Sequence, residues 1–373
     1  MKSKLIFVMA LVLILLSFSS VYAGDADNQT IRATDQITSD NGVIKENTEV
    51  TDVAFENEGS FSELQNLINK SNVVNLTKDY TASESDKRIL ITGDLTIHGN
   101  GHYINGNNIT QIFEITGGNI VLNNVVIMNG KSLNGTEVVL NSTAVVHVSN
   151  ADSLTFNYVK FLDNYAEVNY ATVCIEGNLA RPTYFIHCDF GNNTALTSRV
   201  GIYYTANQPL IVKACNFKSN RARGIGGGAI YTKGSLNVTD SNFIENYALF
   251  LGGAIESDGQ YLNIDNCTFK SNSAGWYCGG AVYAMGTVSV KNSIFIENSA
   301  NFGGAIFSRN LIDIDNCTFK SNHADDTEGG VIYGVNVAVC NSLFIGNHAD
   351  YSEGGAIFAE DKVDVQNSIF SDN

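Results

Sequence analysis

The nine residues from Ile264 to Asn272 read IDNCTFKSN, and the same nine residues return from Ile314 to Asn322, fifty positions further on. They belong to a repeat of about half that length, because the spacing between successive phenylalanines from Phe217 onward is 24 to 26 residues. Self-similarity at a fixed period indicates an architecture in which each repeat is one structural layer. A phenylalanine followed three residues later by asparagine occurs at Phe161, Phe190, Phe217, Phe243, Phe269, Phe295, Phe319, Phe344 and Phe370.

A Gly-Gly pair repeats with the same period, beginning at residues 227, 252, 279, 303, 329 and 354. From Phe217 onward the residues seven and five positions before the phenylalanine are aliphatic, as in Leu262 and Ile264, and this alternation is typical of a half-buried strand. The inward positions change parity after the asparagine that lies three residues before the phenylalanine. Asparagine tolerates the left-handed conformation that a corner requires, and its amide can bond to the next layer. The asparagines predicted to form this corner ladder are Asn266, Asn292, Asn316, Asn341 and Asn367.

Three short strands and three corners in about 25 residues predict an all-β protein, a right-handed parallel β-helix of about eleven coils. The β-branched alternation excludes helical repeats of similar length. We expect residues 89–373 to form these coils. Residues 60–88 are predicted to be an N-terminal cap, in which an amphipathic helix begins after Ser60, with Glu63 completing a capping box.

The first residues predict export. Lys2 and Lys4 precede an apolar run and a Val-Tyr-Ala end, so residues 1–23 are interpreted as a secretory signal peptide, and residues 24–59 as a polar leader or linker. The chain stops at Asn373 in mid-coil, which predicts either a fragment of a longer protein or an exposed sheet edge. We expect an extracellular or cell-surface location, with no membrane span in the mature chain.

The charge balance narrows the range of partners. Removing residues 1–23 takes away two lysines and no acids, so the mature chain carries 20 basic and 38 acidic groups, a formal net charge of −18. This balance argues against nucleic acid and anionic lipid as partners. It favours solubility, and cations or neutral glycans as ligands.

The cysteines predict packing rather than chemistry. Serine replaces cysteine in other repeats at the position two residues before the phenylalanine, so the position requires a small inward side chain. Cys188 and Cys215 lie in adjacent coils, where a disulfide is geometrically allowed. No Cys-x-x-Cys spacing indicates a zinc site. The cysteines of this ladder are Cys188, Cys215, Cys267 and Cys317.

The Gly303 to Ile306 and Phe295 to Asn298 motifs make the repeat resemble that of the chlamydial polymorphic outer membrane proteins. The stretch from Ser60 to Tyr80, together with Ile97 to His102, is similar to adhesin-like surface proteins of methanogenic archaea. The resemblance covers residues 60–373. It implies a right-handed parallel β-helix displayed outside the cell and involved in attachment.

The loops between the repeated alanine and the Gly-Gly pair vary between coils, and stacking should align them along one edge. Their aromatic residues could stack on sugar rings or contact a protein partner, or they could instead fold down over the flank of the coils. Their acidic residues could hold a hard cation such as Ca²⁺. The aromatic candidates are Phe250, Trp276, Tyr277, Phe302 and Tyr351, and the acidic candidates are Asp325, Asp326, Glu328, Asp350 and Glu353.

The sequence therefore predicts an adhesin-like β-helix that attaches to an extracellular glycan or to a surface protein of another cell, without catalytic residues. The alternative from another class is a polysaccharide lyase or glycoside hydrolase, which would need clustered carboxylates or a basic residue beside a groove. Asp325 and Asp326 are an adjacent acidic pair in the repeats, and Arg221 and Arg223 have no evident base beside them. A purely structural coat component is the third possibility.

Overall fold

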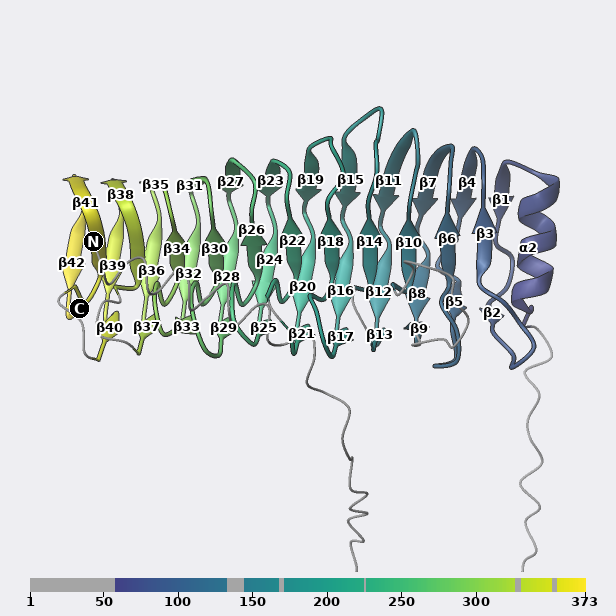
Figure 1. Ribbon diagram of the computed structural model, residues 1–373, viewed down its shortest axis with the longest axis horizontal. Coiled ribbons are helices and arrows are strands. Elements are labelled where there is room, and N and C mark those ends of the chain that lie inside the picture. The colour runs from purple at the N-terminus through teal and green to yellow at the C-terminus, as the bar shows by residue number, and fades with distance from the viewer. Residues whose placement is uncertain (1–57, 133–143, 168–170, 225, 326–329, 351–353) are drawn as a thin grey trace, which may run out of the picture. The chain divides into compact units, whose positions relative to one another are not determined.

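The computed structural model describes residues 58–132, 144–167, 171–224, 226–325, 330–350 and 354–373. The parallel β-helix predicted from the repeat is confirmed, with about eleven turns. Three sheets run along the stack, with 21, 12 and 9 strands, and all strand pairings between coils are parallel (Figure 1). Residues 1–23, predicted as a signal peptide, and nearly all of the predicted leader lie outside the described residues.

The widest sheet takes two strands from most coils, and each narrower sheet takes one. A typical coil therefore has four short strands, and these belong to the three sheets that correspond to the three predicted strands. The first ladder of the widest sheet consists of β3 (Ile89–Ile91), β6 (Phe113–Ile115), β10 (Val146–Val148), β14 (Val173–Ile175), β18 (Ile202–Tyr204), β22 (Ile230–Thr232), β26 (Ile255–Ser257), β30 (Val282–Ala284) and β34 (Ile306–Ser308). Its second ladder consists of β1 (Val73–Asn75), β4 (Leu95–His98), β7 (Asn119–Asn123), β11 (Ser153–Asn157), β15 (Thr183–Ile186), β19 (Leu210–Lys213), β23 (Leu236–Thr239), β27 (Tyr261–Asp265), β31 (Thr287–Lys291) and β35 (Leu311–Asp315). The long strands β38 (Ile332–Cys340) and β41 (Ile357–Gln366) belong to both ladders.

The two narrower sheets close each coil. The 12-stranded sheet consists of β2 (Tyr80–Thr81), β5 (Tyr103–Asn105), β8 (Val126–Met128), β12 (Lys160–Leu162), β16 (Asp189–Gly191), β20 (Asn216–Lys218), β24 (Asn242–Ile244), β28 (Thr268–Lys270), β32 (Ile294–Ile296), β36 (Thr318–Lys320), β39 (Leu343–Ile345) and β42 (Ile369–Ser371). The 9-stranded sheet consists of β9 (Lys131–Ser132), β13 (Tyr165–Ala166), β17 (Thr194–Ala195), β21 (Arg221–Ala222), β25 (Tyr247–Ala248), β29 (Ser273–Ala274), β33 (Ser299–Ala300), β37 (His323–Ala324) and β40 (His348–Ala349).

The repeated nine residues follow the inward and outward positions expected from their parity. Leu262 and Ile264 on β27 are buried, and Asn266 adopts the left-handed conformation with φ of 52°. Cys267 and Phe269 then turn into the core. The corner reverses parity because the left-handed residue bends the chain between the two strands.

The repeated phenylalanines form one continuous stack through the core. From Phe161 to Phe370 each ring lies 4.5 to 4.8 Å from the next and nearly parallel to it. This spacing equals the distance between hydrogen-bonded strands, so each ring packs directly on the ring of the neighbouring coil. The regular spacing of phenylalanine in the sequence is therefore the period of the coil.

The continuous asparagine ladder is formed by a different asparagine from the predicted one. The asparagine three residues after the phenylalanine is buried, as at Asn272, and the left-handed residue at that corner is the preceding one, Ser271. The side chain of Asn272 donates to the Phe243 carbonyl and to Asn298 Oδ1, and its oxygen accepts from the backbone N–H and side chain of Asn246. The same pattern joins Asn164, Asn193, Asn220, Asn246, Asn272, Asn298, Asn322, Asn347 and Asn373.

The predicted corner asparagines lie on the exposed side of the first corner, where their amides bond to both asparagine and aspartate side chains. All five have positive φ values, from 49° to 53°. Asn316 donates to Asn292 Oδ1 in the neighbouring coil, whereas Asn266 and Asn341 donate to Asp240 and Asp315. This second row of amides is therefore mixed and solvent-exposed.

The Gly-Gly pairs form the corner at which backbones of neighbouring coils approach most closely. The first glycine of the pair has positive φ, for example 58° at Gly252. A Cβ at the second glycine, Gly253, would collide with the carbonyl oxygen of Gly280 in the next coil. Glycine is therefore required at both positions, for conformation at the first and for close approach at the second.

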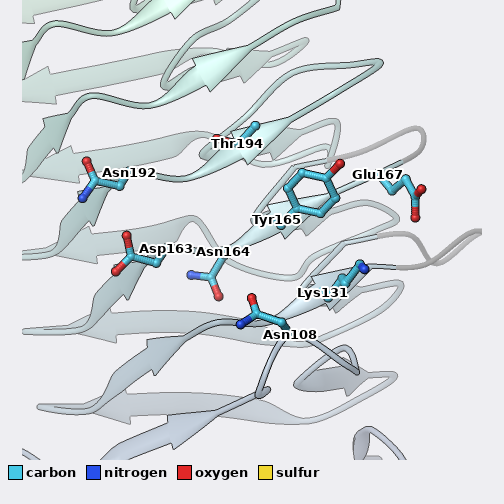
Figure 2. A pocket seen from close by; sticks show the side chains of 8 residues that line it. All are labelled: Asn108, Lys131, Asp163, Asn164, Tyr165, Glu167, Asn192 and Thr194. Carbon is cyan, nitrogen blue, oxygen red and sulfur yellow. The ribbon is translucent and has the colours of Figure 1, made fainter. Parts of the chain in front are cut away.

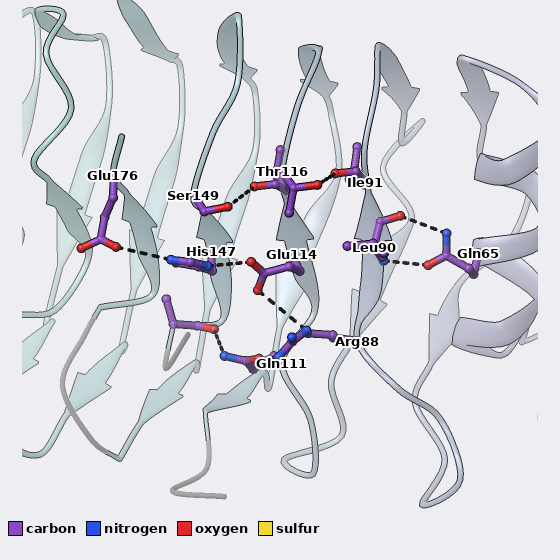
Figure 3. Close-up of polar contacts among 12 residues, drawn as sticks. Gln65, Arg88, Leu90, Ile91, Gln111, Glu114, Thr116, His147, Ser149 and Glu176 are labelled. Atoms are coloured by element: carbon purple, nitrogen blue, oxygen red, sulfur yellow. Dashed lines mark hydrogen bonds and ion pairs between the residues drawn. The ribbon is translucent and has the colours of Figure 1, made fainter. Parts of the chain in front are cut away.

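The helix α2 (Phe61–Lys70) covers the N-terminal end of the stack (Figure 1). Ser60 is its N-cap and accepts from the Glu63 N–H, and Phe61 and Leu64 are buried. The Gln65 amide accepts from the Leu90 N–H at 2.6 Å and donates to the Leu90 carbonyl at 3.0 Å, so it satisfies the open edge of β3 (Figure 3).

Parallel pairing begins before residue 89. The strand β1 pairs with β4, and β2 pairs with β5, so the segment 60–88 contains a first partial coil in addition to the helix. At the other end of the stack, the inward-facing Val363, Val365 and Phe370 are 41 to 47% exposed. None of the helices in the described part of the chain is long and apolar enough to cross a membrane.

All seven cysteines, each within the described residues, are free thiols, and those of the predicted ladder are buried. Cys188 and Cys215 are in contact, with the Cys188 N–H donating to the Cys215 sulfur at 3.3 Å. Burial raises the pKa of the Cys267 thiol to about 12, so this side chain remains neutral. A buried neutral thiol packs as a small hydrophobic group.

Replacing Cys267 by serine is expected to change the free energy of unfolding by less than about 1 kcal/mol. In the neighbouring coils the Ser241 and Ser293 hydroxyls donate to the carbonyl two residues earlier, and a hydroxyl at position 267 can do the same with Asp265. Urea denaturation followed by far-ultraviolet circular dichroism measures the change. Loss of cooperative folding in Cys267→Ser would contradict the packing role.

Candidate functional site

The variable loops are aligned along one edge of the stack. Isolated parallel bridges connect Leu251 to Cys278 and Cys278 to Phe302, one from each of three successive loops. The Asn301 side chain also donates to the Trp276 carbonyl at 3.1 Å. Each loop is therefore held in register by the loop of the neighbouring coil.

The aromatic candidates divide into two groups. Tyr277 and Phe302 are partly buried and pack against a cluster of the loop residue Cys278 with Tyr283, Phe307 and Tyr333 on the first ladder of the wide sheet. These two side chains follow the alternative in which loop aromatics fold down over the flank.

Trp276 remains in solvent, with 64% of its surface exposed. Its ring centroid lies 6.2 Å from that of the half-buried Phe250, which also contacts Tyr277 at 6.0 Å. The indole is thus supported at one edge by a neighbouring ring, while most of its surface is available to a ligand. Tyr351 lies outside the described residues.

Two of the five acidic candidates meet two histidines that the sequence reasoning did not select. Asp325 Oδ1 lies 2.6 Å from His323 Nε2, and the two oxygens of Asp350 lie 3.3 Å from His323 Nε2 and 2.9 Å from His348 Nε2. His323 and His348 occupy the same position of successive repeats, on β37 and β40, and this recurrence is the signal that could have identified them. The remaining acidic candidates, Asp326, Glu328 and Glu353, lie outside the described residues.

This donor set differs from the one expected for a calcium site. Ca²⁺ takes oxygen ligands, whereas imidazole nitrogens suit zinc, copper and nickel. Asp325, Asp350 and His323 could hold an ion, because one donor atom from each lies within 4.8 Å of the others. Calcium binding at these loops stays a prediction.

A polar hollow of about 410 Å³ opens beside the 9-stranded sheet (Figure 2). Its charged side chains are Lys131, Asp163 and Glu167, with the Lys131 ammonium 5.9 Å from the centre of the Tyr165 ring. Burial, with the nearby Glu167 carboxylate, raises the pKa of the Tyr165 phenol, so this hydroxyl is not prepared to act as a base. The full lining consists of Asn108, Lys131, Asp163, Asn164, Tyr165, Glu167, Asn192 and Thr194.

The basic residues considered for a lyase, Arg221 and Arg223, are both exposed, on or next to β21. A different arginine, the half-buried Arg199, forms a close ion pair. Its guanidinium forms two bonds with the Glu256 carboxylate, at 3.1 and 3.2 Å, and lies 3.7 Å from the centre of the Tyr231 ring. Arg199 therefore packs against the flank of the stack, where it is held by Glu256 and Tyr231, and is not part of an open site.

The fold and its periodic core define a class of protein. Residues 137–300 match the family model described as the right-handed beta helix region. The match agrees with the parallel coils of the structure and makes the chain a right-handed parallel β-helix.

Two shorter segments carry a more specific likeness. Residues 292–309 and 341–360 match the Chlamydia polymorphic membrane protein repeat. The resemblance to archaeal adhesin-like proteins stays a prediction. The chain is also 32% identical over 117 residues to the metabotropic glutamate receptor-like protein R of Dictyostelium discoideum, a match that spans 30% of this chain and 7% of that protein.

Proposed function

We propose that this chain is an adhesin-like protein of the cell surface or extracellular space that binds a glycan or a surface protein of another cell, without catalysis. The observation that carries the proposal is the Trp276 indole, 64% exposed at the centre of the aligned loops. The match to a polymorphic membrane protein repeat supports a surface-associated role. The predicted signal peptide supports export, and the negative net charge supports a partner that is neither nucleic acid nor anionic lipid.

The geometry of the loop edge suits binding. The flat apolar face of an indole can stack on the C–H face of a sugar ring or enter a pocket of a protein partner. Because the loop of Trp276 is held by backbone bridges to the loops on both sides, little conformational entropy is lost when a ligand binds. Repetition of the coil presents several loops in a line, which favours an extended ligand.

Polysaccharide cleavage is the second candidate, and the observation that favours it is the polar hollow with Asp163, Glu167 and Lys131 at its wall. Two carboxylates beside a groove are the minimum for hydrolysis of a glycosidic bond, whereas a lyase needs a basic residue there. The two candidates are separated by incubating the purified chain with a panel of neutral and uronate polysaccharides. Release of new reducing or unsaturated ends contradicts the adhesin proposal, whereas retention of a polysaccharide or cell-surface protein without product supports it.

Replacing Trp276 by alanine is expected to weaken binding to the retained ligand at least about tenfold, since a central aromatic contact is worth about 1.4 kcal/mol or more. The melting temperature should stay nearly unchanged, because most of the indole is already in solvent. Isothermal titration with the ligand and thermal denaturation measure the two quantities.

Tyr261→Ala is the matched control, because Tyr261 is also an aromatic residue with 57% of its surface exposed, and it lies on β27 away from the loops. This variant should bind as the unmodified chain does. If Trp276→Ala lowers only the melting temperature, the aromatic loop residues are structural and the proposed binding edge is wrong.

A further inference from the structure

The first ladder of the wide sheet carries a buried polar row on its outward face. Glu114 on β6, His147 on β10 and Cys174 on β14 are aligned in register. All three are at least nine-tenths buried, although they lie on the face opposite the phenylalanine core. Glu176 follows two residues after Cys174, so strand alternation places it on the same face.

The two ring nitrogens of His147 have different surroundings (Figure 3). Nδ1 lies 2.8 Å from Glu114 Oε1, a hydrogen-bond distance. Nε2 has no hydrogen-bond partner among the described residues, and the closest charged atom is Glu176 Oε2 at 3.6 Å. A buried ring nitrogen without a partner is costly and so requires an explanation.

The unpartnered nitrogen faces two further metal-binding side chains. One donor atom each from His147, Cys174 and Glu176 lies within 4.8 Å of the others. Ligands of one tetrahedral metal ion are slightly closer than this, because each bond is about 2.0–2.3 Å long. Binding therefore requires the Cys174 and Glu176 side chains to move closer to His147.

Glu114 completes the arrangement found behind metal-bound histidines. Such a histidine donates its second ring N–H to a carboxylate, which orients the ring and raises the basicity of the ligating nitrogen. Glu114 takes this role through Nδ1, and the Arg88 Nε lies 3.7 Å from the other Glu114 oxygen. A divalent ion also balances the charge, because the ion and Arg88 together offset the negative charges of a Cys174 thiolate, Glu114 and Glu176.

We propose that His147, Cys174 and Glu176 bind a Zn²⁺ ion, with Glu114 as the residue that orients His147. A set of one nitrogen, one sulfur and one oxygen favours zinc over calcium or magnesium, which take oxygen ligands. The ion connects the adjacent strands β10 and β14, and a fourth ligand position remains for water. Binding therefore stabilises the stack at these two coils.

Local spacing motifs do not detect this set. His147 and Cys174 are 27 residues apart, one coil of the stack, and they meet only because β10 and β14 pair in register. The proposal is independent of the proposed attachment function, since the loops with Trp276 lie in other coils.

The test uses the full purified chain, stripped with chelator and then loaded with zinc or cobalt. We expect one tightly held zinc per chain by elemental analysis after dialysis, a rise in melting temperature on loading, and a thiolate-to-cobalt charge-transfer band with Co²⁺. Cys174→Ser should remove the charge-transfer band and lower zinc affinity at least about 100-fold. Cys278→Ser, which changes another buried cysteine of the flank, should leave all three readouts unchanged.

Glu176→Gln is the second ligand variant, for use if Cys174→Ser fails to give the circular dichroism of the folded chain. It should weaken zinc binding in the same direction, with an unchanged fold. The proposal is overturned if the unmodified chain retains no zinc, or if both folded ligand variants retain as much zinc as the unmodified chain. It is equally overturned if zinc is lost only on His323→Gln, because the ion then belongs to the exposed histidine–aspartate cluster.

Discussion

Replacing Asn272 by alanine is expected to lower the free energy of unfolding by about 3–5 kcal/mol. The side chain is fully buried and serves two neighbouring coils. Its removal deprives the Asn246 N–H and the Phe243 carbonyl of their partners and interrupts the amide contact with Asn298. Each buried group left unpaired costs about 1–3 kcal/mol. Urea denaturation followed by far-ultraviolet circular dichroism measures the effect.

Asn263→Ala is the matched control for this experiment. Asn263 lies in the same coil and donates to Asn237 Oδ1 of the neighbouring coil at 2.8 Å, but on the exposed face. Water replaces that bond, so we expect a loss of less than about 1 kcal/mol. Equal losses of unfolding free energy for the two variants would show that burial does not account for the stabilising effect of the buried asparagine ladder.

Replacing Arg199 by alanine is expected to cost about 3–5 kcal/mol near neutral pH, because it leaves the Glu256 carboxylate buried without its counter-charge. The Glu256 side chain is only 3% exposed, and Arg199 provides both of its close bonds. The guanidinium also covers the face of Tyr231, a contact that is lost with the charge. Arg223→Ala, at an exposed position, should change stability by less than about 0.5 kcal/mol.

The cost of Arg199→Ala should depend on pH. Burial raises the pKa of Glu256 above its ordinary value of 4.5, and Arg199 opposes that rise. Loss of Arg199 therefore raises the pKa further, so the folded variant takes up a proton at a pH where the unfolded chain does not. Stability linked to that proton is fully present below the ordinary pKa and is lost as the pH rises through the folded pKa.

The stability of the variant should accordingly be closest to that of the unmodified chain at about pH 5 and furthest from it at about pH 8. Denaturation curves at several pH values measure this dependence. The double variant Arg199→Ala with Glu256→Gln should be more stable than Arg199→Ala alone at about pH 8, because a neutral amide is less costly to bury than an unpaired carboxylate. A loss that does not vary with pH would indicate that the ring contact, not the charge, is what matters.

Much of the fold could be predicted from the sequence, because one period governs it. Alternation within the strand makes Leu262 and Ile264 inward-facing. The corner then moves the inward positions by one residue, to Cys267 and Phe269, and the repeat gives the same result in each coil. The role of Asn272 could not be read in the same way. An asparagine next to a corner can either adopt the left-handed conformation or fill the interior with its amide, and only the coordinates show that Ser271 takes the first role.

The candidate sites were harder to predict, since they depend on contacts between coils. Alignment of the loops follows from stacking, but the division between the exposed Trp276 and the packed Tyr277 depends on the direction of each side chain. The histidines beside Asp325 and Asp350 lie on the strands that precede the variable loops, so the variation between loops gives no sign of them. The flank residues His147 and Cys174 are a whole coil apart in the sequence, so no local spacing motif connects them.

The unbroken stack of phenylalanines and inner asparagines has a consequence for how such a gene can change. Because each coil bonds only to the coils on either side, removal or duplication of one whole period returns every ring and amide to an equivalent neighbour. A deletion of half a period would instead place a phenylalanine beneath a loop and an asparagine amide beneath an aliphatic strand. The length of the molecule can therefore vary in whole coils, while the loops that separate the periods can change their residues freely.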